Sequence, residues 1–476
     1  MNGSLNINNN TTLKTNRILC TNSKPNSATF QKILSFLRKD KVQMIETQFS
    51  EPPMRARPFL QSGFLSGQIL SPNNNDPESF HCAIRPVLSL AQMFGILPVL
   101  GIRRPSPLQL KFVKFSFCTI YAVFISTMVL VMAILSILHM IKTLNSVTFE
   151  VKGGIAAATA GAVFYTNCVI GQLIFFRLSP RWVTLQRDWR SMEQFIDSNK
   201  IERPKLRWKF NTISSSILFL ALIEHIFSII QNTLEYDWSG KSENSTFQNF
   251  LQVYCTSSHS FILQSLKYNF VLGIFIFIVS KLATFTWNFT DVFIMTVSTG
   301  LAERYRILNK HVMSSISKHQ RIDWCGLRED YAALSCMVKK VDKNIAPIIL
   351  LSFANNLYFI CLQLLNGLSK PENGILSDIY FFGSFVFLIG RTVIVTLLTS
   401  RIHDQSKVIL PLLYSCSTST YNTETERLIY LLTTDDVVLT GMRFFSITRN
   451  FMLAVAGAIV TYEVVLLQFN VAIKGK

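Results

Sequence analysis

The residues of this sequence that could do chemistry are polar side chains set inside long apolar runs. Glu224 and His225 are adjacent in one such run, and a later run carries Ser352, Asn356 and Gln363. Steps of four and seven between the last three place them on one face of an α-helix. Because such groups are costly in hydrocarbon unless they face protein or water, they indicate a binding site or hydrogen bonds between helices.

Three more polar residues extend this set. Tyr358 lies in the same run as Asn356, and Asp378 and Tyr380 open the next apolar run. Carboxylates and amides hydrogen-bond hydroxyl groups and aromatic rings stack on C–H faces, so the set suits a polyhydroxylated ligand. Hydrogen bonds that hold a helical bundle together explain the same residues. The spacing alone leaves both interpretations open.

A basic residue, Arg391, lies deep in the apolar run that follows Asp378. Asp291, in an earlier run, is its candidate partner. A structural ion pair or a snorkelling side chain explains an arginine in this position.

The last apolar run begins with small residues and ends with a polar stripe. The small residues permit close helix packing; they are Ala454, Gly457, Ala458 and Thr461. Thr461 and Gln468 are seven apart and share one face, while Tyr462 and Phe469 share the next face. Such a stripe either lines water or packs against polar partners.

Catalytic and metal-binding patterns are missing from the sequence. It has no P-loop, no GxSxG or HExxH motif and no dinucleotide fingerprint. Its nine cysteines form no CxxC pair and no cluster with zinc-ligand spacing. We therefore expect neither an enzyme nor a protein with a metal or cofactor.

The elements that must position these residues are membrane-spanning helices. Only 16% of the 476 residues are charged and 49% are hydrophobic, whereas a soluble domain carries about 25% charged residues. The charges lie between apolar runs of roughly 20 residues, which is long enough to cross a bilayer. The sequence predicts an all-α, polytopic protein in contact with membrane lipids, with seven spans at 112–141, 153–176, 210–232, 261–297, 346–368, 376–398 and 447–469.

The remaining stretches complete a predicted domain organisation. Residues 1–76 form a disordered cytoplasmic tail, 77–111 an interfacial or re-entrant helix, and 401–446 cytoplasmic helices. Residues 112–400 hold spans one to six, and 447–476 hold span seven and a short outer tail. Span four continues without proline to His311, which predicts a helix of ~65 Å that leaves the bilayer and joins a cytoplasmic bundle.

Charge predicts the orientation. The region before residue 112, the stretch 177–209 and the stretch 304–343 are rich in Lys and Arg, and the alternate loops carry few. Positive loops stay cytoplasmic, so the N-terminus is inside and the C-terminus outside, opposite to a G-protein-coupled receptor. The net charge of +18 then reflects orientation and not a nucleic-acid partner. A sequon at Asn244 falls in an outer loop and predicts glycosylation.

The terminal run 461–469, Thr-Tyr-Glu-Val-Val-Leu-Leu-Gln-Phe, resembles the signature of insect gustatory receptors. Glu463 departs from the usual hydrophobe but is similar to what sugar receptors carry. Further segments across residues 80–470 resemble the sugar-sensing clade: Phe80-His81, the run 97–103, Glu224-His225, the runs 287–291, 355–359 and 363–366, and Gly390-Arg391-Thr392.

The resemblance implies a function. It implies a tetramer, homomeric or mixed, that forms a sugar-gated, poorly selective cation channel in the plasma membrane of gustatory neurons. A mono- or disaccharide would bind a pocket within each subunit, at Glu224, His225, Asn356, Tyr358, Gln363, Asp378 and Tyr380. Span seven would line the pore for permeant cations, with a gate at Thr461, Tyr462, Gln468 and Phe469. The rival hypothesis is a metabotropic receptor that signals through a partner protein; a transporter is disfavoured because the sequence shows no internal repeat.

Overall fold

The computed structural model describes residues 76–146, 154–197, 203–234, 246–263, 266–318, 321–368, 375–415 and 421–474. All of them belong to the compact unit Leu65–Lys476. The predicted tail 1–76, except Asp76, and the sequon at Asn244 lie outside the described residues.

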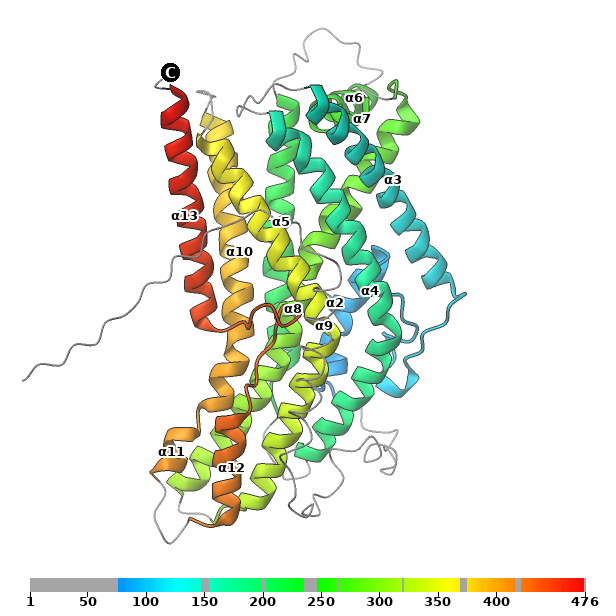
Figure 1. The fold of residues 1–476 in the computed structure, drawn as a ribbon. Coiled ribbons are helices and arrows are strands. Elements are labelled where there is room, and N and C mark those ends of the chain that lie inside the picture. The colour runs from blue at the N-terminus through cyan, green and yellow to red at the C-terminus, as the bar shows by residue number, and fades with distance from the viewer. Residues whose placement is uncertain are drawn as a thin grey trace, which may run out of the picture. The chain divides into compact units, whose positions relative to one another are not determined.

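Long helices make up most of the described chain (Figure 1). They are α3 (Phe117–Ser146), α4 (Gly154–Asp197), α5 (Leu206–Leu234), α8 (Phe270–Ser317), α9 (Trp324–Leu368), α10 (Ile375–Lys407) and α13 (Arg449–Lys474). Within the described residues, the six from α3 to α10 are long and apolar enough to cross a membrane. The prediction of an all-α, polytopic membrane protein is confirmed, and α13 occupies the place of the predicted seventh span.

Shorter elements lie before and between the long helices along the chain. Beside α3 they are α2 (Phe80–Met93) and the 3-10 helix η2 (Pro107–Gln109). Between α5 and α8 they are α6 (Thr246–Ser258) and α7 (Ser260–Leu263), and between α10 and α13 they are α11 (Leu410–Tyr414) and α12 (Thr423–Thr434).

The fourth span begins later than the sequence predicts. Residues 261–263 belong to α7, and α8 starts at Phe270 after Asn269, whose backbone is extended. The chain turns here because α6 and α7 lie over the ends of other helices, with Cys255 and Ile262 fully buried in a core cluster that includes Ile276 of α8. The predicted long continuation of span four is present, since α8 has 48 residues and measures ~72 Å.

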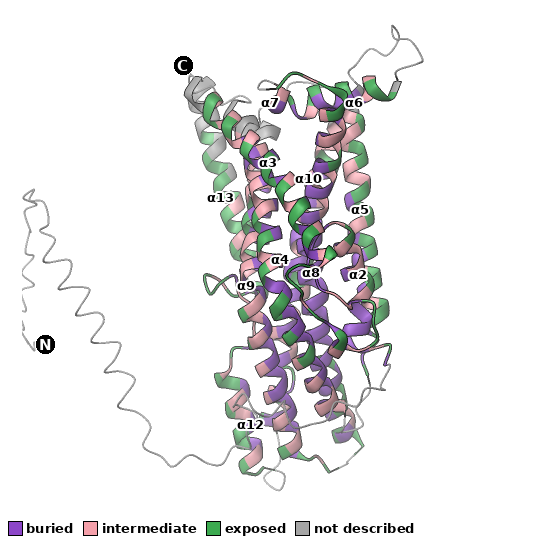
Figure 2. Cartoon of the chain, turned by 90° about the vertical axis from the view of Figure 1, so that its right-hand side faces the viewer, coloured by how far each residue is buried: buried purple, intermediate pink, exposed green. Residues whose placement is uncertain are grey.

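Burial divides the helical bundle into two halves. Figure 2 shows buried residues gathered along the α2 and α12 half, while the half near α6 and α7 shows more exposed and intermediate residues. Residues 288–305 of α8 are all buried, whereas α5 exposes Phe219, Leu222 and Ile226. Exposed apolar side chains on such helices fit a surface in contact with lipid tails.

Candidate functional site

A buried ion pair joins α8 to α10 at the centre of the bundle. Nε of Arg391 lies 2.9 Å from Oδ2 of Asp291, and the two side chains are 2% and 0% exposed. This confirms the partner that the sequence suggested for Arg391. Asp291 also accepts hydrogen bonds from Ser352 and from Nδ2 of Asn356, the latter at 3.1 Å. Both residues lie on α9, so one carboxylate ties three helices together.

The guanidinium group of Arg391 also has hydrogen-bond partners and an aromatic ring around it. It donates to Asn288 and, at 3.1 Å, to Oδ1 of Asn356, and it lies 4.6 Å from the ring centroid of Trp287. Nε1 of Trp287 donates to the same oxygen of Asn356 at 3.1 Å. A buried charge is tolerated when it is paired and hydrogen-bonded in this way. We call Trp287, Asn288, Asp291, Ser352, Asn356 and Arg391 the central network.

Asn356 therefore has a structural role in hydrogen bonding that its spacing in the sequence did not reveal. Its amide oxygen accepts two hydrogen bonds and its nitrogen donates one, all within the central network. Trp287 and Asn288 entered the sequence reasoning only through the family resemblance, although an amide and an indole beside an acid in an apolar run are themselves a signal.

Two of the predicted sugar-binding residues meet near the central network. Glu224 of α5 interacts electrostatically with Arg391. The hydroxyl of Tyr380 on α10 lies beside Glu224 and Ser228. Gln363 of α9 donates from Nε2 to Oγ of Ser384 on α10 at 2.9 Å. Its Oε1 is buried and has no hydrogen-bond partner among the described residues.

The other predicted sugar-binding residues are spread over three helices. The hydroxyl of Tyr358 hydrogen-bonds Oγ1 of Thr159 on α4 at 2.9 Å, and Asp378 lies in the first turn of α10. His225 lies toward Lys281 and His259, and its Nε2 is buried without a partner among the described residues. The structure therefore does not gather the whole predicted set around one point.

A second polar cluster lies under α6 and α7. Nε2 of His259 is 2.9 Å from the hydroxyl of Tyr165, and Nζ of Lys281 donates to the hydroxyl of Tyr254 at 3.1 Å. Burial, followed by the positive charge of Lys281 and by His225, lowers the pKa of His259 to about 3, so His259 is neutral at physiological pH. Sequence reasoning missed this cluster because it depends on contacts between residues 246–263 and distant helices.

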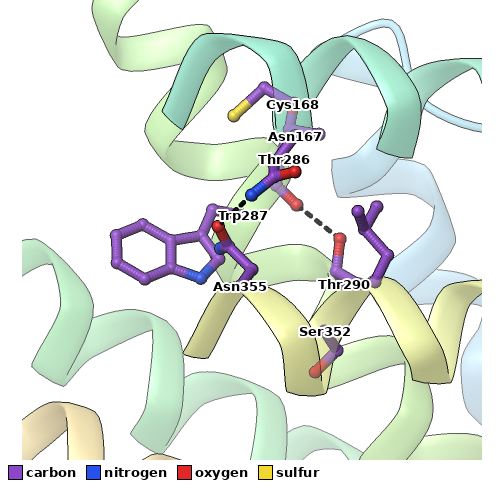
Figure 3. A pocket seen from close by; sticks show the side chains of 8 residues that line it. Asn167, Cys168, Thr286, Trp287, Thr290, Ser352 and Asn355 are labelled. Atoms are coloured by element: carbon purple, nitrogen blue, oxygen red, sulfur yellow. Dashed lines mark hydrogen bonds between the residues drawn. The ribbon is translucent and has the colours of Figure 1, made fainter. Parts of the chain in front are cut away.

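A small cavity lies beside the central network, between α4, α8 and α9 (Figure 3). Its volume is about 10 Å³, which holds roughly one water molecule. Polar groups line it, including Ser352, and Nδ2 of Asn167 donates to Oδ1 of Asn355 across it at 2.7 Å. It suits a bridging water and is far too small for a sugar ring.

The predicted gate residues lie along α13. Thr461 donates from Oγ1 to the carbonyl of Gly457 at 2.8 Å, and Thr461, Tyr462 and Gln468 are all exposed. Phe469 belongs to α13, but its side chain is outside the described residues. Among residues of α13 whose exposure is described, none is buried.

The sequence matches a known protein family over most of its length. Residues 32–475 match the family described as "Trehalose receptor". The chain is 31% identical over 446 residues to "Gustatory receptor for sugar taste 64a" of Drosophila melanogaster, covering 90% of this chain and 93% of that protein. It is 30% identical to "Gustatory receptor 5a for trehalose" of the same species, covering 82% of this chain and 85% of that protein.

The fold is similar to that of a solved olfactory receptor. The insect olfactory receptor OR5 from Machilis hrabei, solved in complex with eugenol, superposes with a TM-score of 0.60 at 14% identity. The match covers 83% of this chain and all of that one. The resemblance to gustatory receptors is confirmed: this chain is a multi-pass membrane protein that belongs to the trehalose receptor family of insect gustatory receptors, which is a family of receptors and not of enzymes.

Proposed function

We propose that this gustatory receptor is a sugar-gated, poorly selective cation channel in the plasma membrane of gustatory neurons. The names of its relatives point to sugars as ligands, among them trehalose. The observation that carries the channel proposal is the exposure of α13. Leu453 and Val460 are 68% and 58% exposed, and, apart from the surrounding backbone of α13 itself, nothing lies within 4 Å of where a Cβ on Gly457 would be.

Such a helix fits the centre of an assembly of four copies. Small residues allow helices to approach closely, and Ala454, Gly457 and Ala458 are all exposed on α13. In the proposed tetramer, homomeric or mixed, Thr461, Tyr462, Gln468 and Phe469 line the outer part of the pore. The orientation predicted from charge places the N-terminus inside and the C-terminus outside.

The proposed sugar pocket lies between α5, α9 and α10, on the outer side of the central network. Glu224, Tyr380 and the unpartnered oxygen of Gln363 supply the hydrogen-bonding groups that a polyhydroxylated ligand needs. His225, Tyr358 and Asp378 stay in the proposed set on the strength of the sequence, although His225 lies toward Lys281 and Tyr358 bonds Thr159 of α4. Asn356 and Arg391 form the floor of the pocket. A sugar bound here would act on helices α9 and α10 together.

A packed route leads from this floor to α13. Phe353 of α9 is adjacent to Ser352 of the central network, and its ring lies 5.3 Å from that of Phe451 near the start of α13. Phe445, in the segment before α13, stacks on Phe451 at 4.5 Å and lies 5.6 Å from Phe353. A shift of α9 on sugar binding would therefore move the base of the proposed pore helix.

Recording from the purified receptor in a lipid bilayer tests the channel proposal. We expect a sugar such as trehalose to evoke single-channel cation currents with no other protein present. A metabotropic receptor with the same pocket would bind the sugar but conduct no current without a partner. Sugar binding without any current, measured on the same preparation, would therefore favour the rival hypothesis.

A further inference from the structure

A wide groove lies outside the proposed pocket and pore, between α2, the loop that follows it and the start of α3. Its volume is about 670 Å³, within the range of ligand-binding sites. One side is apolar, with Met93 and Phe117, which are 63% and 83% exposed, and Cys118. The other side carries Arg103 and Arg104, both exposed. The groove thus joins an apolar wall to a basic rim.

The basic rim is held in place by its backbone. Nε2 of His81 is hydrogen-bonded to the carbonyl of Arg104 at 2.9 Å, and Arg85 donates to the carbonyl of Arg103 at 3.1 Å. Leu100 and Lys111 exchange two backbone hydrogen bonds, at 2.8 and 3.0 Å, that close the loop. These contacts tie the loop to α2 and to itself and leave both arginine side chains exposed.

A positive φ of 87° at Gly101 makes the bend in this loop possible. A Cβ there would come within 2.5 Å of the carbonyl oxygen of Gln109, closer than real Cβ contacts allow. The groove is therefore a formed feature of the fold and does not depend on a ligand to shape it.

The charge of the rim has no counterpart within the groove. None of the residues that line it is acidic, and in the described part of the chain no ion pair is formed by Arg103 or Arg104. Lys111 and Lys114 follow on the same segment and are exposed. An anionic group in the groove would find two arginines and no acid to repel it.

The apolar wall continues along the outside of the helical bundle. Ile120, Val123 and Phe124 on α3 are 59%, 49% and 60% exposed, directly following Phe117 and Cys118 along the helix. A soluble anion would leave this surface unused, whereas the tail of a lipid would run along it into the hydrocarbon region.

We propose that this groove binds an anionic phospholipid of the cytoplasmic leaflet, with its head group at Arg103 and Arg104 and an acyl chain along Met93, Phe117 and Cys118. The leaflet assignment rests on the proposed orientation, which places the N-terminal side of α3 in the cytosol. Basic clusters just inside a span attract the anionic lipids of that leaflet.

Native mass spectrometry of the full-length receptor in detergent, titrated with phosphatidylserine, tests the proposal without any current being measured. We expect one phosphatidylserine per chain to bind in preference to phosphatidylcholine. R103Q/R104Q should weaken that binding about 30-fold, since each basic residue near a lipid surface contributes roughly a factor of five. The matched control K318Q/R321Q removes two exposed basic residues at the end of α8 and just beyond it, outside the groove, and should bind as the wild type does.

A second variant separates a lipid from a soluble anion. Cys118→Trp fills the apolar wall without changing charge, so it should weaken binding of phosphatidylserine, and soluble glycerophosphoserine should not compete in the wild type. Equal binding by the wild type and R103Q/R104Q, or an equal loss in K318Q/R321Q, would overturn the proposal. The proposal would also be overturned if glycerophosphoserine competed effectively with phosphatidylserine and C118W bound phosphatidylserine normally. That result would assign the rim to a soluble anion. Because a pore is not needed for any of these measurements, their failure is distinct from failure of the channel proposal.

Discussion

Helices α8 and α13 belong to one chain but differ in where their contacts lie. Residues 288–305 of α8 are all buried by the chain itself, whereas no residue of α13 with described exposure is buried. The contacts of this stretch of α8 are therefore complete within one chain, whereas the exposed surface of α13 is left for lipid or for other copies of the chain. Changes around α8 should act on the stability of the single chain, and changes on α13 should act on assembly and conduction.

The largest expected effect comes from breaking the ion pair between α8 and α10. Arg391→Met leaves Asp291 charged and buried without its partner, which costs about 3–5 kcal/mol. We expect this variant to lose most of its thermal stability, measured by fluorescence-detected size-exclusion chromatography after heating.

The double variant D291L/R391M is the control for that experiment. It removes both charges, so it should be more stable than either single variant, although Asn288 and Asn356 would lose partners. If R391M were as stable as the wild type, the burial of α8 would not reflect stability and the contrast with α13 would fail.

Substitutions in the proposed pocket should have an intermediate effect, because its residues are partly buried and partly unpaired. Glu224→Gln or Gln363→Ala should raise the sugar concentration for half-maximal response by roughly 5- to 150-fold, since a lost hydrogen bond to a buried partner costs ~1–3 kcal/mol. Dose–response curves in transfected cells, corrected for surface level, measure this change. Gln252→Ala, at an exposed position on α6, is the matched control.

Two other outcomes would change the interpretation of the pocket residues. Normal dose–response curves for both variants would place the pocket elsewhere. Reduced surface level with an unchanged curve would mean that these side chains hold helices together. We expect that second outcome for Asn356→Ala, because the amide of Asn356 makes three hydrogen bonds within the central network.

Sequence reasoning predicted the long helices and the Arg391–Asp291 pair for a common reason. Apolar runs and a lone buried charge are local signals, and Asp291 in an earlier run was a candidate partner for that charge. The α6–α7 cap and the cluster around His259 depend on long-range contacts, so residues 246–263 read as a polar loop and the start of a span. Asn356 shows the same limit, since spacing placed it on the right helical face but could not show that Arg391, Trp287 and Asp291 already use its amide.

Substitutions of the predicted gate residues test whether changes on α13 act on conduction. Phe469→Ala should raise the current without sugar by about tenfold, because losing ~1.5 kcal/mol of apolar contact in a closed constriction shifts a two-state equilibrium by that factor. Gln468→Glu should change cation preference by adding a ring of negative charge. Val460→Ala, on the side of α13 opposite Phe469 and 58% exposed, is the control. Unchanged basal current and permeation in channels that reach the surface would remove the gate assignment.

The smallest expected effect lies at the segment that leads into α13. Asp435 accepts hydrogen bonds from Ser335 at 2.9 Å and Lys339 at 2.8 Å, both on α9. Burial alone would raise the pKa of Asp435, but these hydrogen bonds and the charge of Lys339 lower it below the ordinary value of 3.8. Since Lys339 is 57% exposed, Asp435→Asn should cost only about 0.2–1 kcal/mol.

The pH dependence of that effect follows from the direction of the shift. An acid whose pKa is lowered by folding stabilises the folded state above its unfolded pKa, and that contribution disappears as the pH falls through the folded pKa. The Tm difference between the wild type and D435N should therefore be constant from pH 8 to about pH 5 and should shrink only below about pH 4. Asp436→Asn, at a neighbouring carboxylate that is 83% exposed, should show no such difference. A Tm difference that changed near neutral pH would mean that another titrating group holds this segment, and the base of α13 would then be anchored by contacts other than those with Lys339 and Ser335.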